Sequence, residues 1–173
     1  MPENSRADQV QEKPLRLLFI GQAPSRETDG LPPFVGKCGK FLAELMGTDQ
    51  ASMLVAHDFK NVLDHWPGKG IGGDLFPVKE AKAAAKLLLE DCRGRAVVLL
   101  GNNVARAFEM KAFRYLELYQ VKDPVDPAKV MVPLMVVVPH PSGINHWYNR
   151  PENRDSARKF LRTLSEAKLE KSQ

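Results

Sequence analysis

Four apolar runs constrain the fold of this chain more than any other feature of its sequence. They are LRLLFIG at 15–21, the weaker and mixed SMLVAHDFKNVL at 52–63, RAVVLLG at 95–101 and VMVPLMVVVP at 130–139. Runs that are apolar at successive rather than alternate positions are typical of parallel strands that helices cover on both faces. The runs therefore predict a central sheet with helices packed on both of its sides.

Helical patterns follow each of these runs. The expected helices cover residues 37–47, 78–92, 102–110 and 152–172. The second is rich in strong helix formers, and the asparagines that begin the third can cap its amides. Strand and helix thus alternate four times, which predicts the α/β class. We expect a three-layer α/β/α sandwich with a central, mostly parallel four-stranded sheet and right-handed crossovers.

The chain length of 173 residues and the lack of a long apolar stretch set the expected organisation. We expect one domain over residues 14–168, a flexible N-terminal tail over 1–13 and a frayed C-terminus over 169–173. The longest apolar run is far too short to span a bilayer, and the polar N-terminal residues lack a signal-peptide core. These features favour a cytoplasmic protein that does not engage a membrane.

Charge and cysteine content narrow the function only partly. A formal net charge of +4 permits nucleic-acid binding but is equally compatible with a slightly basic protein that has no such partner. Cys38 and Cys92 lack CxxC spacing, and two thiols cannot supply a four-cysteine zinc or iron–sulfur site. We therefore expect no metal and no other cofactor, and packing is the default role of both cysteines.

The unusual residues collect in the loops that follow the predicted strands, where open α/β sheets bind their ligands. These loops are GQAPSRETDGLPPFVG, NVLDHWPGKGIGGDLFP, GNN and HPSGINHWYN. Glycines in the first could allow a close backbone approach to an anion, although glycine spacing alone is better explained by a tight turn. The chain has neither a GxGxxG nor a Walker motif, so it carries no nucleotide signature.

Three side chains in these loops have chemistry that suits a flat, polar ligand. Phe34 could stack on such a ligand, Asn61 could read a base edge with its donor and acceptor, and His140 could donate to a developing oxyanion. Taken singly, each is more often structural. The same holds for the rings and aliphatic side chains that could wedge into a base stack and for the cations that could meet phosphate: Ile144, Trp147, Tyr148, Lys60, Lys69, Arg150 and Arg154.

Two motifs at opposite ends of the chain resemble those of the uracil-DNA glycosylase superfamily. GQAPSRETDGLPPFVGKCGKFL is similar to the first motif, and closest to the GEAPG…G.PFVG.AG..L pattern of the bacterial and archaeal iron–sulfur branch. HPSGIN is similar to the second motif, as found in the single-strand-selective and mismatch-specific branches. AVVLLGNNVARAF resembles the third strand and following helix, and the likeness covers most of residues 15–165. It implies a base-flipping enzyme that cleaves the N-glycosidic bond of uracil in DNA.

The resemblance also implies a role for each matching residue. Phe34 matches the ring that stacks on the flipped base, and Asn61 the amide that reads the uracil edge. His140 matches the histidine that stabilises negative charge on O2 of the departing uracil. The DNA-binding loop that enters the minor groove and fills the vacated space corresponds to Pro141, Ser142, Gly143, Ile144 and Asn145.

The sequence departs from the family pattern directly after its first glycine. Related branches place Asp, Asn or Glu there to position or activate water, whereas this chain has Gln22 and Ala23. We assign Gln22 to catalysis as a group that orients water without acting as a general base, and Ala23 to substrate binding. Glu27 or Asp29 could substitute, although a solvated acidic loop is the simpler interpretation. Ser25 or a neighbour holds the position of a thymine-excluding tyrosine, and the cluster cysteines are missing.

The leading prediction is a monofunctional DNA glycosylase that removes uracil or a related deaminated base and leaves an abasic site for base excision repair. We expect it to act as a monomer on DNA. One alternative is a glycosylase-like DNA-binding protein with weak or no catalysis, motivated by Gln22 and Ala23. Another is an α/β enzyme acting on a free nucleobase or nucleoside, motivated by the modest charge. Salt dependence separates the last alternative from the first two, because binding to DNA phosphates should weaken steeply as salt increases and binding of a small neutral ligand should not.

Overall fold

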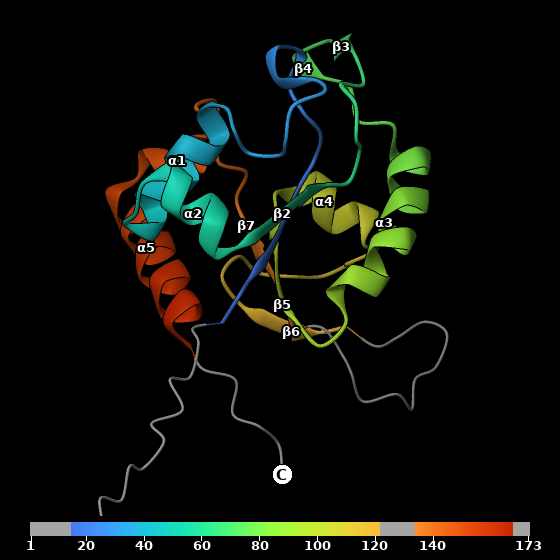
Figure 1. Cartoon of the computed structure of the whole chain (residues 1–173). Coiled ribbons are helices and arrows are strands. Elements are labelled where there is room, and N and C mark those ends of the chain that lie inside the picture. The colour runs from blue at the N-terminus through green and yellow to red at the C-terminus, as the bar shows by residue number, and fades with distance from the viewer. Residues whose placement is uncertain (1–14, 122–133, 168–173) are drawn as a thin grey trace, which may run out of the picture.

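A five-stranded sheet lies at the centre of the computed structural model, which describes residues 15–121 and 134–167 (Figure 1). The strands run in the order β2–β1–β5–β7–β6. Their bounds are Leu18–Gly21 for β1, Asp58–Asn61 for β2, Ala96–Leu100 for β5, Leu118–Gln120 for β6 and Leu134–Val138 for β7. All neighbouring strands are parallel except β6, which pairs antiparallel with β7. The predicted α/β sandwich is confirmed, and the predicted strand number is corrected from four to five.

Helices cover both faces of this sheet. One face carries α1 (Lys37–Met46), α2 (Gln50–Ala56) and α5 (Pro151–Glu166), and the other carries α3 (Val78–Cys92) and α4 (Asn102–Ala107) (Figure 1). Four shorter elements complete the described chain. They are the 3₁₀ helices η1 (Arg26–Thr28) and η2 (His146–Asn149) and the hairpin strands β3 (Lys69–Gly70) and β4 (Gly73–Asp74).

Successive side chains of the central strands enter two separate cores. In β1, Phe19 packs with α1 and α5, whereas Leu18 and Ile20 pack with α3 and α4. The valines and leucines of β5 divide between the two cores in the same way. Because strand side chains alternate between faces and both faces are covered, every position must be apolar. This explains the unbroken apolar runs from which the sheet was predicted.

The predicted strand at 52–63 is wrong over its first half. Asp49 accepts a hydrogen bond from the Ser52 amide at 2.9 Å and begins α2, in which Met53 is the buried residue. Only Asp58–Asn61 forms a strand, at the edge of the sheet. The aspartate cap selects a helix for an apolar run that, without the cap, resembles a strand.

The fifth strand was missed because it is short and half exposed. β6 has three residues, and the first and last of them are exposed. An edge strand needs no continuous apolar run, so it leaves little pattern in the sequence. Residues 122–133, which include the start of the last predicted strand, lie outside the described residues. The same applies to the predicted tail and frayed end, while α5 ends at Glu166 rather than at 172.

The described segments contain no helix that is both long and apolar enough to cross a membrane. The cytoplasmic location expected from the sequence stays a prediction.

The path of the chain creates a switch point between two neighbouring strands. From β1 the chain passes through α1 and α2 on one face to reach β2. From β2 it returns through α3 on the opposite face to β5, which lies on the other side of β1. Loops therefore diverge from the carboxyl ends of β1 and β5, and open α/β sheets bind ligands at such a point.

His57, directly before β2, links the stability of the fold to pH. It is only 8% exposed, and its Nδ1 accepts a hydrogen bond from the Leu17 amide at 3.3 Å. Burial, together with the nearby charge of Arg16, holds the pKa of His57 below its ordinary value. The folded protein therefore keeps this ring neutral at pH values where the unfolded chain binds a proton.

We expect the free energy of unfolding to fall as the pH drops below about 6.5, the ordinary histidine value, because only the unfolded state gains a proton there. The loss is complete below the folded-state pKa. Urea midpoints measured between about pH 7.5 and 5.5 should decline more steeply for the wild type than for His57→Gln, which has no titrating ring. His140, whose pKa is also lowered, is present in both proteins and cancels. Parallel curves would contradict the prediction.

Candidate active site

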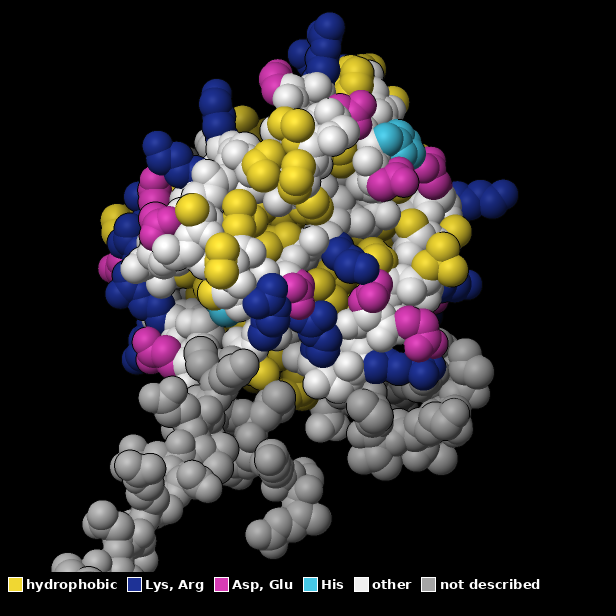
Figure 2. Space-filling view, in the orientation of Figure 1, with side chains coloured by type: hydrophobic (Ala, Val, Ile, Leu, Met, Phe, Trp, Pro, Cys, Tyr) yellow, Lys and Arg dark blue, Asp and Glu magenta, His cyan; other side chains and the backbone are white. Residues whose placement is uncertain are grey.

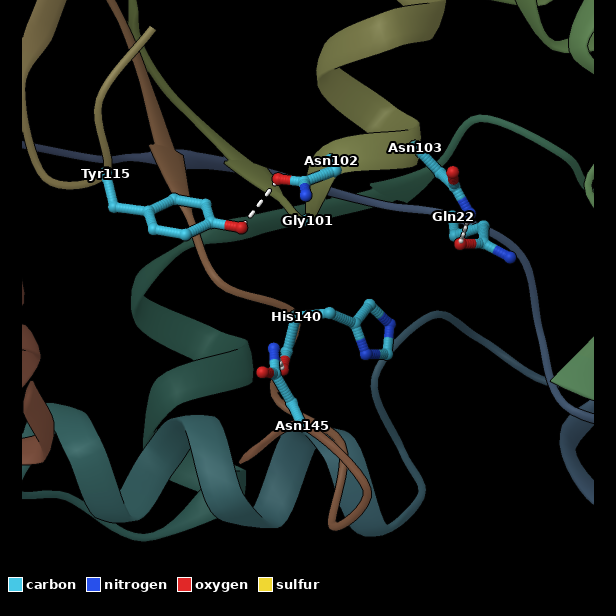
Figure 3. A pocket seen from close by; sticks show the side chains of 7 residues that line it. All are labelled: Gln22, Gly101, Asn102, Asn103, Tyr115, His140 and Asn145. Carbon is cyan, nitrogen blue, oxygen red and sulfur yellow. Dashed lines mark hydrogen bonds between the residues drawn. The ribbon is translucent and has the colours of Figure 1, made fainter. Parts of the chain in front are cut away.

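A polar pocket of about 250 Å³ lies where β1, β5 and β7 end, at the switch point of the sheet (Figure 3). Its lining consists of Gln22, Gly101, Asn102, Asn103, Tyr115, His140 and Asn145. Among these seven residues there are four side-chain amides, one phenol and one imidazole, and there is no carboxylate and no amine. The pocket can therefore donate and accept hydrogen bonds, and the imidazole is its only side chain of a type whose ordinary pKa lies near neutral pH.

His140 is held firmly at the end of β7. Its backbone carbonyl accepts hydrogen bonds from the Ser142 amide at 2.9 Å and from Asn145 Nδ2 at 3.0 Å. A Cβ on Gly101 would lie 3.0 Å from the His140 Cβ, so a glycine there keeps the strand ends close together. Burial lowers the pKa of His140, which favours the neutral ring. Figure 3 shows this ring directed to the side of Gln22, away from Tyr115.

Gln22 and Asn103 form a hydrogen-bonded pair on the opposite wall. Asn103 Nδ2 donates to the side-chain oxygen Oε1 of Gln22 at 3.0 Å. The backbone carbonyl of Gln22 accepts a hydrogen bond from the Leu63 amide, also at 3.0 Å. The sequence predicted that the asparagines would cap α4. That prediction is wrong, because Gly101 is the N-cap residue and no side-chain cap is formed. Both asparagine side chains instead line the pocket.

Asn102 and Tyr115 complete the pocket. The sequence placed Asn102 in a predicted ligand-binding loop without giving it a role, and it did not single out Tyr115. The Tyr115 hydroxyl donates to Asn102 Oδ1 at 2.6 Å, and the tyrosine ring meets the Trp147 ring edge-on, with centroids 5.8 Å apart. The position of Asn102 directly after a predicted strand was a usable signal. Tyr115 gave none, because it lies in a connection between elements and reaches the pocket only through the fold.

Phe34 and Asn61 lie together against Gly21, the residue before Gln22. Neither of them lines the pocket itself. A Cβ on Gly21 would lie 2.5 Å from Phe34 Cζ and 2.6 Å from Asn61 Oδ1, so both side chains rest against this glycine. Phe34 adopts a left-handed backbone with φ of 63°, and Gln50 Nε2 donates to its carbonyl at 2.7 Å. The structure thus brings an aromatic ring and a side-chain amide together at the end of β1.

Residues 7–165 match the family model described as the uracil DNA glycosylase superfamily. The chain belongs to this superfamily. Members of this superfamily are DNA glycosylases of base excision repair, so DNA glycosylase is the general activity that the family supports, with DNA as its partner. The match does not separate the branches. No curated protein matches the chain.

The remaining first-motif residues of this glycosylase lie outside the pocket lining. Ala23 packs against the core under α3 and α4. The Ser25 amide bonds to Thr28 Oγ1 at 2.9 Å, at the start of η1. Glu27 is exposed, and Asp29 accepts a hydrogen bond from the Trp66 amide at 2.9 Å. Neither carboxylate lines the pocket that contains Gln22.

The loop after His140 presents one prominent apolar side chain, Ile144, which is 76% exposed. Pro141 is buried, Ser142 is half-buried and Gly143 is exposed. Asn145 uses both ends of its amide inside the loop, because its Oδ1 also accepts from the Trp147 amide at 3.1 Å. Contacts of these residues with DNA stay a prediction. Ile144 suits such a contact best, because its apolar side chain is exposed.

The two rings that follow this loop pack within the protein. Tyr148 is 3% exposed and its hydroxyl donates to the Pro139 carbonyl at 2.8 Å, so the suggestion that it wedges into DNA is wrong. Trp147 is half-buried between Tyr115 and Tyr148. Trp147 therefore packs against Tyr115, which lines the pocket, and Tyr148 packs against Trp147 on its other side.

The cations considered for phosphate binding are dispersed. Lys60 pairs with Asp91 at 2.7 Å, and the Arg154 guanidinium lies over the Phe41 ring at 5.7 Å. Lys69 and Arg150 are exposed. Figure 2 shows Lys and Arg interspersed with Asp and Glu on the face in view, without a single basic patch.

The iron–sulfur cluster of the branch with the closest first motif does not fit these residues. Cys38 lies on α1 and Cys92 ends α3, on opposite faces of the sheet. Over residues 15–121 and 134–167, no three His, Cys, Asp or Glu side chains form a group that could hold a metal ion.

Proposed function

We propose that this glycosylase hydrolyses the N-glycosidic bond of uracil or a related deaminated base that is flipped out of DNA, leaving an abasic site. The observation that carries the proposal is His140, half-buried at the pocket where β1, β5 and β7 end, with a lowered pKa that favours the neutral ring. Uracil leaves as an anion while the sugar becomes oxocarbenium-like. A preorganised N–H at uracil O2 lowers this barrier without needing a positive charge on the ring.

Two features support recognition of the base and the monofunctional character of the reaction. Phe34 and Asn61, side by side on Gly21, offer a stacking ring and a donor–acceptor pair for the uracil edge. A glycosylase that also cuts the strand needs an amine to form a Schiff base with the sugar. No lining residue of the pocket is an amine, which supports simple hydrolysis.

The exposed side chain of Ile144 supports base flipping. Flipping costs a few kcal/mol for unpairing and unstacking, and an apolar side chain in the vacated space offsets part of that cost. Ile144 is four residues from His140, on a loop anchored by Asn145. Uracil in single-stranded DNA should therefore be the easier substrate, because little stacking has to be broken.

A second candidate is a DNA-binding protein with weak or no catalysis. One observation favours it: the seven pocket residues include no carboxylate to activate water. It predicts salt-dependent binding of uracil-containing DNA without base release. The family match disfavours the third possibility, an enzyme that acts on a free nucleobase.

The deciding experiment uses oligonucleotides that carry one uracil, either single-stranded or in a duplex. We expect base release, seen as strand scission after alkali, first on the single strand. Binding should weaken steeply as salt increases, because counterions are released from phosphates. The matched control is the same strand with thymine in place of uracil, which reports whether the 5-methyl group is excluded. Intact strands at high enzyme concentration, also with other deaminated bases, would favour the binding candidate.

A further inference from the structure

We infer that Asn103 is a positioning residue that fixes the direction of the Gln22 amide, so that its oxygen accepts a hydrogen from the attacking water. This assignment rests on the proposed function. Its basis is the hydrogen bond of 3.0 Å from Asn103 Nδ2 to Gln22 Oε1, between residues 81 positions apart in the sequence (Figure 3).

The two partners differ in how firmly the fold holds them. Asn103 is the second residue of α4, and the residues that follow it, Val104 and Ala105, are fully buried. Its backbone is therefore fixed by the core. Gln22 follows the last residue of β1, and three side-chain torsions separate its amide from the backbone. The rigid asparagine can orient the more adaptable glutamine, rather than the reverse.

The hydrogen bond matters because the two ends of an amide have similar shapes and opposite polarity. The Asn103 Nδ2 donor finds an acceptor only if Gln22 turns Oε1, and not Nε2, toward it. The oxygen keeps a second lone pair for a water hydrogen. If the amide were reversed, an N–H would face that water and occupy one of its two lone pairs, which would make the water a weaker nucleophile and leave its hydrogens without the Gln22 acceptor.

The reaction that this water completes consumes one water molecule for each base released. The bond between C1′ of the sugar and the base nitrogen breaks, and its electron pair stays on the base. The water oxygen then forms a bond to C1′, and the proton lost by this water passes to solvent or to the departing base. Gln22 only orients the water, since an amide cannot accept its proton near neutral pH.

The bond between Asn103 and Gln22 has no other evident structural role. The start of α4 does not need it, because no side chain caps this helix. The adjacent Asn102 has a different partner, the Tyr115 hydroxyl. Among the described residues, Gln22 is the hydrogen-bond partner of the Asn103 side chain.

The test compares Asn103→Ala in two backgrounds, Gln22 and Gln22→Glu, by single-turnover excision of uracil at about pH 8, where a glutamate is ionised. With Gln22 we expect a loss of about tenfold, the effect of one hydrogen bond. With Gln22→Glu we expect less than about twofold, because the two carboxylate oxygens are equivalent and need no orientation. A purely structural role for Asn103 would give the same loss in both backgrounds.

Two further variants control for folding. Asn103→Asp keeps the shape of the side chain and places a carboxylate in the first turn of α4, where it suits the helix dipole, but it cannot donate when ionised. In the background that retains Gln22, Asn103→Asp should lose as much activity as Asn103→Ala does. Its urea midpoint of unfolding should equal that of the wild type. Arg106→Ala, on the exposed side of the same helix, should retain wild-type activity.

The possible outcomes separate the two proposals. A loss confined to the Gln22 background supports the positioning role. Equal losses in both backgrounds, or no loss in either, overturn that role while the proposed function stands. Absence of scission by the wild-type protein overturns the proposed function and the role of Asn103 with it.

Discussion

Replacement of His140 by alanine should lower the single-turnover rate of uracil excision by about 10²–10³-fold, the usual effect of removing one oxyanion donor. The ring is half-buried at the pocket and its pKa is lowered, so we expect it to act as a neutral donor that needs no reorganisation during the reaction. The substitution removes stabilisation that develops only as the base departs. Affinity for uracil-containing DNA should therefore change much less than the rate.

His146 provides a matched control within the same loop. Its side chain is exposed and bonds to Asn149 rather than facing the pocket. His146→Ala should excise uracil at nearly the wild-type rate, and His140→Gln, which keeps an N–H donor, should recover part of the lost activity. A His140→Ala protein with a rate within about fivefold of wild type would place the donor elsewhere.

Replacement of Gly39 by alanine should destabilise the protein by about 3 kcal/mol, at the upper end of typical overpacking effects. In an ordinary helix the same change stabilises by roughly 1 kcal/mol. Here the new Cβ would fall deep inside the contact distance of the Phe34 carbonyl oxygen, and 2.8 Å from Gln50 Nε2. Either α1 or the Phe34 turn must move, and the hydrogen bond from Gln50 to that turn is lost.

The melting temperature of Gly39→Ala should fall by roughly 10 °C. Uracil excision should also fall by at least about fivefold at a temperature where the protein is folded, because base stacking on an aromatic ring contributes about 1–3 kcal/mol. Lys40→Ala, at the next and exposed position of α1, is the control and should change neither quantity. A wild-type melting temperature in Gly39→Ala would show that the turn adapts without strain.

The sequence alone determined the layered architecture, because burial on both faces of a parallel sheet leaves a direct record. β1, β5 and β7 lie in unbroken apolar runs whose residues fill two cores. The runs also indicated where the strands end, and therefore that Gln22 and His140 would meet at one edge. Elements stabilised by a single cap or by edge pairing, such as α2 and β6, left no comparable record.

The resemblance to a glycosylase family suggested roles for loop residues whose sequence neighbours are glycines and prolines. The structure places Phe34 and Asn61 together against Gly21, while their roles in binding a base stay a prediction. It also reassigns Tyr148 from DNA to the core, because its hydroxyl is satisfied by the Pro139 carbonyl. A motif fixes which residues are near each other, but it does not tell which side chains point outward.

What the tertiary structure alone decided is the set of side-chain pairs that complete the pocket. Asn103 meets Gln22, and Tyr115 meets Asn102, because the strand order brings β1 and β5 side by side and carries a connecting loop across their ends. The sequence could not reveal these pairs, since a hydrogen bond between polar side chains depends on a contact of a few ångströms and imposes no periodic pattern on the chain. Hydrophobic burial repeats along an element and can be predicted from sequence, whereas the polar geometry of a site depends on where the elements meet.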